Sequence, residues 1–157
     1  MHPAKFALVP RGWRAFDDDF GLLTRHGASV ESHALSWRYR PDSFGWANAM
    51  PRGAMAVTVI LLRRSNDPHA NLCRGADGLL FAPIRRLPLR LPKAPNGWLE
   101  GSKDVVEYRV FGRIDRSYSV DLRLAVRTIH PTAAMLRRGQ AVVSGIRFPR
   151  WPRPKRC

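Results

Sequence analysis

Acidic side chains are scarce in this chain of 157 residues, which has 12 Asp and Glu residues against 27 Lys and Arg residues. Asp121 is the last acid in the sequence, and the formal net charge at pH 7 is +15. A positive field of this strength favours association with a polyanion such as nucleic acid, with an anionic surface or with an acidic protein, and it carries no information about the fold.

Cysteines are also few, and Cys73 and Cys157 are the only two. Small secreted domains use denser cysteine frameworks, so we expect no required disulfide here. The longest hydrophobic run, residues 54–62, is much shorter than the ~20 residues of a membrane-spanning helix. The first residues do not join a charged region to an apolar one. The default expectation is a cytoplasmic protein, and an extracytoplasmic location stays open if the N-terminus is truncated.

Local motifs of the common catalytic classes are absent. The sequence has no Gly-x-Ser-x-Gly, no His-Glu-x-x-His and no complete Gly-rich phosphate loop. Asp19, Phe20 and Gly21 spell a metal-binding tripeptide of protein kinases, but the other kinase motifs are missing. We therefore predict no catalytic residue, no metal site and no cofactor. Asp17 to Asp19 are expected to form a solvated acidic turn, and His33 to be a half-buried structural histidine.

The length and the 45% hydrophobic content are those of one globular domain. We predict that residues 1–148 form this domain and that residues 149–157, with three prolines, form a basic extended tail. Residues 5–9 and 29–39 are expected to be strands. Residues 55–62 are apolar on both faces, which is typical of a central strand. The prolines around residues 84–91 limit that segment to an edge strand or an extended connection.

Alternation is strict in residues 106–114 and 118–126, which predict a β-hairpin. In the expected register Val110 faces Leu122 and Tyr108 faces Leu124. Charged residues occupy the other face, where Arg109 would lie opposite Arg123 and diagonal to Asp121. That second face is expected to be open to solvent, so that an acid at residue 119 would be tolerated.

A C-terminal helix follows, with Thr132 as its N-cap and Gly145 at its end. Its apolar residues recur at spacings of three and four, which predicts that one side of the helix packs on the sheet. Gln140 and two arginines are expected on the outer side. Residues 146–148 are expected to add a last short strand. The fold class predicted from these elements is α+β, a mostly antiparallel sheet packed against a C-terminal α-helix in a single-domain sandwich.

Basic residues that could contact a polyanion form two groups. The tail group combines positive charge with an indole ring that can stack on bases. Its members are Arg147, Arg150, Trp151, Arg153, Lys155 and Arg156. The second group is a basic face predicted from the hairpin and the helix. Its members are Arg109, Arg113, Arg123, Arg127, Arg137 and Arg138.

The order of elements resembles that of PsbP-like α/β sandwich domains. The resemblance is carried by Phe6, Pro10 and Trp13 near the start and by a helix leading into residues 143–148 near the end. Families of this fold are non-catalytic accessory or binding modules, often outside the cytoplasm, and the resemblance implies such a role here without assigning any functional residue.

Three functions follow from the sequence, in decreasing order of support. The first is a non-catalytic binding or accessory module for an acidic protein or polyanion. The second is a nucleic-acid or anionic-surface binding protein that uses the Arg-rich C-terminal segment. The third is a small hydrolase-type enzyme. The sequence leaves the oligomeric state open.

Overall fold

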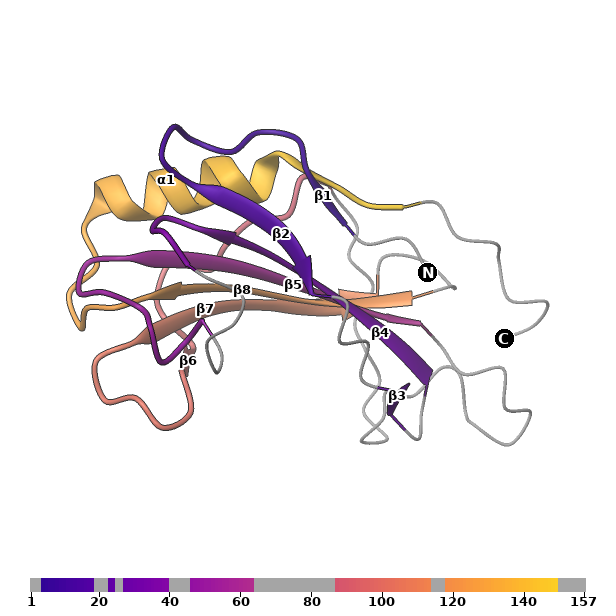
Figure 1. Cartoon of the computed structure of the whole chain (residues 1–157), viewed down its shortest axis with the longest axis horizontal. Helices are drawn as coiled ribbons and strands as arrows, with labels where there is room; N and C mark the ends of the chain where they lie inside the picture. The colour runs from indigo at the N-terminus through magenta and orange to yellow at the C-terminus, as the bar shows by residue number, and fades with distance from the viewer. Residues whose placement is uncertain are drawn as a thin grey trace.

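The computed structural model describes residues 4–18, 23–24, 27–39, 46–63, 87–113 and 118–149. These residues form a twisted antiparallel sheet, one helix that covers one of its faces, and a two-stranded ribbon beside the helix (Figure 1). The strands of the sheet are β2 (Arg14–Asp18), β4 (Gly27–Leu35), β5 (Met55–Arg63), β6 (Gly97–Trp98), β7 (Val106–Arg113) and β8 (Tyr118–Val126). The helix is α1 (Ala133–Ser144). The predicted α+β class, with an antiparallel sheet packed on a C-terminal helix, is confirmed.

The strands lie in the order β2-β4-β5-β8-β7-β6, and the short strand β3 (Leu23–Thr24) pairs with β4. β5 is central and buried on both faces, as predicted. Val57 and Val59 lie beneath the helix, whereas Ala56 and Thr58 belong to the other face, and all four side chains are buried. Among the described residues, no helix has both the length and the apolar character needed to cross a membrane.

The hairpin of β7 and β8 has the register predicted from its alternation. Val110 pairs with Leu122, and Tyr108 pairs with Leu124. Leu122 and Leu124 are fully buried in the main core beneath α1. The predicted turn at residues 115–117 lies outside the described residues. The paired positions alternate between the two faces of the sheet, so this register also fixes which charged residues share the face opposite the helix.

The boundaries of α1 are those predicted. The Thr132 hydroxyl accepts a hydrogen bond from the Met135 N–H at 3.2 Å, and the Gly145 N–H donates to the Ala141 carbonyl. The prediction for Gln140 is wrong, because this side chain is half-buried rather than on the outer side. Its amide donates to the Leu89 carbonyl and accepts from the Leu91 N–H, both at 2.9 Å. The helix thereby holds the segment that precedes β6.

The strand predicted at residues 5–9 is shorter in the structure, where β1 covers Lys5–Phe6 and the next N–H, that of Ala7, donates to the Gly145 carbonyl. β1 pairs with β9 (Ile146–Arg147), so the first and last strands form one ribbon. The expected last strand is thus present and ends one residue early. Residues 84–86 lie outside the described residues, and residues 87–91 form no strand.

Two further expectations near the N-terminus are wrong. Asp17 and Asp18 belong to strand β2 and not to a turn, and Asp19 lies outside the described residues. β4 ends at Leu35 rather than continuing to residue 39, since the chain bends at residues 36 and 37. In the first case tertiary pairing outweighed local composition, because β2 pairs along its length with β4.

Candidate functional site

The ribbon of β1 and β9 places two cations directly opposite each other. Lys5 pairs with Arg147, and both side chains are exposed. Their neighbours explain this orientation, because Ala4 and Ile146 are buried in the core and strand alternation then turns residues 5 and 147 outward. Like charges in directly opposed positions destabilise a strand pair. Among the described residues, no carboxylate forms an ion pair with either side chain, so a bound anion would relieve the repulsion.

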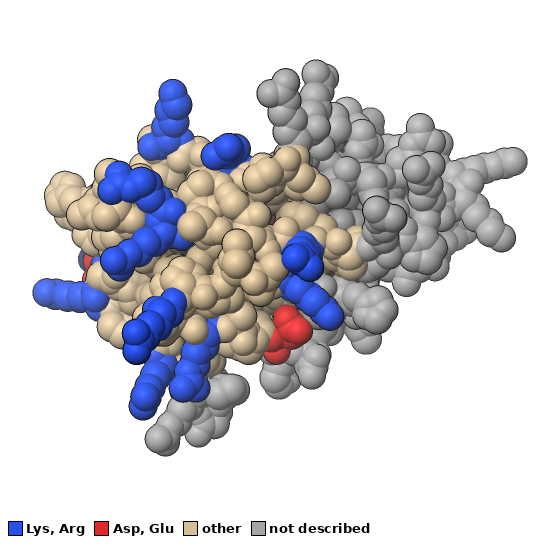
Figure 2. All heavy atoms as spheres, turned by 90° about the horizontal axis from the view of Figure 1, so that it is seen from above, with Lys and Arg blue, Asp and Glu red and all other residues tan. Residues whose placement is uncertain are grey.

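Two more cations lie on the outer side of α1. Arg137 and Arg138 are exposed, and the helix contains no acidic residue. The helix leads directly into β9, so these arginines belong to the same layer of the molecule as the ribbon (Figure 1). We refer to Lys5, Arg137, Arg138 and Arg147 as the cationic face. Figure 2 looks down on this layer, and blue side chains clearly outnumber red ones over the part that it colours.

The opposite face of the sheet also carries arginines, but their charges are matched internally. Asp121 accepts hydrogen bonds through Oδ2 from Arg109 Nη2 at 3.0 Å and from Arg123 Nη2 at 2.6 Å. Burial alone would lower the pKa of Arg123, but the hydrogen bond and charge of Asp121, helped by Glu107 and Glu31, outweigh it and raise that pKa. The guanidinium therefore stays charged and is neutralised within the protein.

Exposure of this second face was predicted wrongly. Ser119, Glu107 and Asp121 are buried, with exposed fractions of 3%, 3% and 5%. An acid at residue 119 would therefore enter a closed polar layer next to existing carboxylates. The diagonal contact of Arg109 with Asp121 and the direct opposition of Arg109 to Arg123 are both present as predicted.

Arg127 follows β8 and is also engaged within the chain. Its Nε donates to Asp104 Oδ2 at 3.0 Å, and its Nη1 donates to the Met50 carbonyl. The hydrogen bond from Arg127 lowers the pKa of Asp104 below its usual 3.8, and a hydrogen bond from Ser102 acts in the same direction. Arg127 thus fastens the loop before β7 to the turn before β5.

The set predicted as one basic face is therefore divided between two faces of the molecule. Arg109 and Arg123 lie on the sheet, where Asp121 compensates them, whereas Arg137 and Arg138 lie on the helix. Arg113 ends β7, and its side chain lies outside what the structure describes. Arg147 is the one member of the tail group that is described. The others, residues 150, 151, 153, 155 and 156, lie outside the described residues.

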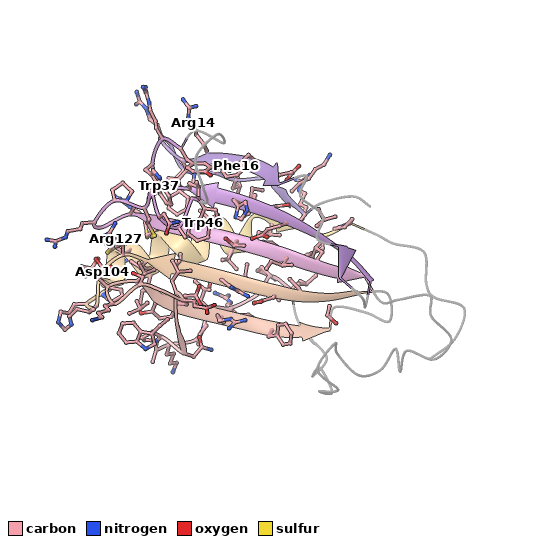
Figure 3. All side chains as sticks on the ribbon, turned by 60° about the horizontal axis from the view of Figure 1, so that its bottom comes forward. Arg14, Phe16, Trp37, Trp46, Asp104 and Arg127 are labelled. Atoms are coloured by element: carbon pink, nitrogen blue, oxygen red, sulfur yellow. The ribbon has the colours of Figure 1, made fainter. Side chains whose placement is uncertain are left out.

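An aromatic cluster closes one end of the face opposite α1 (Figure 3). Phe16 stacks on Tyr39 with ring centroids 5.7 Å apart, and His33 lies 5.1 Å from Phe16 and 5.7 Å from Trp46. His33 is more buried than predicted, with 1% of its surface exposed. Its Nδ1 is 3.0 Å from the Thr58 hydroxyl, and its Nε2 is 3.5 Å from Glu31 Oε1. This arrangement is that of a second small core.

Lys5 is the residue of the cationic face that the sequence did not reveal. Its period-two neighbours indicate a strand, but the pairing of that strand with residues 146–147 joins chain ends that no local pattern connects. Within the described residues, no group of three or more His, Cys, Asp or Glu side chains is arranged to hold a metal ion.

Comparisons with known proteins give no relative: no family model, no curated protein and no solved structure matches this chain. The resemblance to PsbP-like domains therefore stays a prediction.

Proposed function

We propose that this chain is a non-catalytic binding module that holds a polyanion on its cationic face. The observation that supports this most is the opposition of Lys5 and Arg147 without an acidic partner among the described residues. The arginines of β7, β8 and the residue after β8 differ in this respect. Arg109, Arg123 and Arg127 each have a carboxylate oxygen within 3.0 Å of a guanidinium nitrogen.

The sequence after Arg147 supports the same assignment. Five further basic or aromatic residues follow within nine positions, at residues 150, 151, 153, 155 and 156. Such a segment would extend the cationic face along a phosphate backbone, and an indole among cations suits stacking on unpaired bases. We therefore take single-stranded nucleic acid as the ligand to test first, with duplex and anionic lipid vesicles as the competing polyanions.

Salt dependence measures how many phosphates are contacted. If about five cations neutralise phosphates of a single strand, the logarithm of the binding constant should fall with the logarithm of salt concentration with a slope of about −3.5. The measurement is a fluorescence-anisotropy titration of a labelled single strand at several salt concentrations. Trp151→Ala should cost about 1–3 kcal/mol on a single strand and much less on duplex, where the bases are already stacked.

Lys5→Glu separates binding from stability, because it converts a like-charge pair with Arg147 into an opposite pair. The free protein should gain roughly 0.2–1 kcal/mol of unfolding free energy, while the salt slope for the single strand should decrease in magnitude by about 0.7. Lys103→Glu is the matched control. It makes the same charge change in the loop between β6 and β7, which Figure 1 places on the other side of the sheet from α1.

The control should leave the salt slope near that of the native chain. Equal losses in the two variants would mean that binding depends only on net charge, and the cationic face would then have no special role. Binding to vesicles but to neither nucleic acid would assign the face to an anionic membrane surface instead.

A further inference from the structure

The outermost strand β2 has an edge that no other described strand covers. β2 consists of Arg14, Ala15, Phe16, Asp17 and Asp18, and it pairs with β4 on one side only. An edge strand presents a row of backbone N–H and C=O groups that can template pairing with another strand. The opposite edge of the sheet is different, because Asn96 bonds to both backbone groups of Arg109 there.

The register of the sheet shows which backbone groups of β2 point outward. The Ser36 N–H donates to the Met55 carbonyl, so even-numbered residues of β4 direct their backbone groups to β5 and odd-numbered ones direct theirs to β2. The β2 residues opposite those odd positions are Arg14, Phe16 and Asp18. It follows that Ala15 and Asp17 direct their N–H and C=O groups away from the sheet.

We propose that this edge is a dimer interface, at which β2 pairs antiparallel with β2 of a second copy of the chain around a two-fold axis at Phe16. In this register Ala15 faces Asp17 of the second copy, and each of these pairs exchanges backbone hydrogen bonds. A shift by one residue would place residues of opposite sheet faces side by side, so the face pattern rules it out. The two sheets become one continuous sheet across the axis.

Charge complementarity identifies a second copy as the partner. Arg14 of one copy occupies the position opposite Asp18 of the other, on the same face of the joined sheet, and the symmetry repeats this pair. Within one copy neither charge is matched by its cross-strand partner. Asp18 lies opposite Glu31, a like charge, and Arg14 lies opposite Leu35. The pairing thus places an opposite charge across the new strand pair from each of these two positions.

Phe16 provides the apolar part of the interface. It is half-buried and stacked on Tyr39 in the aromatic cluster. At the two-fold axis it meets Phe16 of the second copy in a position without hydrogen bonds, where opposed strands approach most closely, with Cα atoms about 4.5 Å apart. The aromatic clusters of the two copies then become contiguous.

Sedimentation of the full chain at a series of protein concentrations tests the proposal. The native chain is expected to pass from monomer to dimer as the concentration rises. Arg14→Asp and Asp18→Arg should each weaken the dimer about tenfold, since each change sets like charges opposite each other at two symmetric positions. The double variant restores opposite charges and should recover most of the native affinity. Neither residue belongs to the cationic face, so loss of polyanion binding leaves this test unaffected.

Ala15→Pro is a second, backbone-level test. It removes an N–H that points outward and leaves the hydrogen bonds to β4 in place, so a monomer with a native circular dichroism spectrum is expected. Lys103→Glu serves as the control and should dimerise like the native chain. A native chain that stays monomeric at all concentrations, or a dimer that persists in Ala15→Pro and in both charge reversals, would overturn the assignment.

Discussion

Arg123 donates two hydrogen bonds to one oxygen of Asp121, from Nη2 at 2.6 Å and from Nε at 3.0 Å. The carboxylate is almost fully buried, with 6% of its side chain exposed, and the guanidinium is one-third exposed. Arg109 reaches the same oxygen from the neighbouring strand. One carboxylate oxygen therefore accepts hydrogen bonds from two arginines on the face opposite the helix, and Glu107 and Glu31 add negative charge near Arg123.

Replacing Asp121 by Asn should be strongly destabilising. The amide has nearly the shape of the carboxylate but no charge, so two partly buried guanidiniums lose the carboxylate to which both are hydrogen-bonded. We expect a loss of about 2–4 kcal/mol in the free energy of unfolding, measured in urea. Asp104→Asn is the comparison, because it removes the partner of Arg127 at an exposed position. Its effect should be much smaller, and similar losses in the two variants would contradict the account of the buried pair.

Leu122→Asp tests the packing of the hairpin beneath α1. Leu122 is fully buried, and a carboxylate without a partner in that core costs several kcal/mol. That is a large part of the roughly 5–15 kcal/mol by which proteins of this kind are stable. Ala141→Asp introduces the same charge at an exposed position of the helix and should change the melting temperature little. Comparable thermal melts of the two variants would mean that the assigned faces are wrong.

Local patterns in the sequence predicted the hairpin, the central strand and the helix caps, because each depends on residues close together in the chain. The pairing of Val110 with Leu122 follows from the strict alternation of apolar and polar residues on both sides of a short turn. Thr132 and Gly145 mark the helix ends through their own backbone and side-chain chemistry. These features are encoded within about twenty residues, so they can be read without knowledge of the tertiary fold.

Pairings between distant segments were not predictable in the same way. Lys5 faces Arg147 across almost the whole chain length, and Asp17 entered a strand because β4 lies beside it. Gln140 has an outward position in the helical pattern, yet it bonds to a segment about fifty residues earlier. The candidate site could therefore be predicted only in part. The sequence indicated Arg147 as a basic residue, whereas its pairing with Lys5 was seen only in the structure.

Tyr108 should give the protein an alkaline limit. Burial raises the pKa of its phenol above the usual 10.0, since ionisation would place a charge in the core. A group whose pKa is higher in the folded state stabilises the fold below its unfolded value and loses that contribution as the pH rises through the folded value. Above pH 10, urea unfolding should thus show the native chain losing more stability than Tyr108→Phe, with the two similar at pH 7. Parallel profiles would contradict this assignment.

At Gly139, α1 packs against the sheet without room for a side chain. A Cβ added there would lie 2.5 Å from Leu124 Cδ2 and 3.0 Å from its Cδ1, and Leu124 is fully buried. Helix propensity alone favours Ala over Gly by about 1 kcal/mol, whereas overpacking a closed core costs about 1–3 kcal/mol. The clash should therefore exceed the gain, and Gly139→Ala should lower the free energy of unfolding.

A double-mutant cycle identifies the cause of that loss. Leu124→Ala alone should cost about 2–5 kcal/mol through the cavity that it leaves. Combined with Gly139→Ala, which then has room for its methyl group, the total loss should be smaller than the sum of the two single losses by roughly 0.5–3 kcal/mol. Leu122→Ala is the matched control, because Leu122 is equally buried on the same strand and is not among the atoms nearest to Gly139. It should combine additively with Gly139→Ala. If Gly139→Ala raised the stability, or if both combinations were additive, the close approach of α1 to β8 would not limit this position.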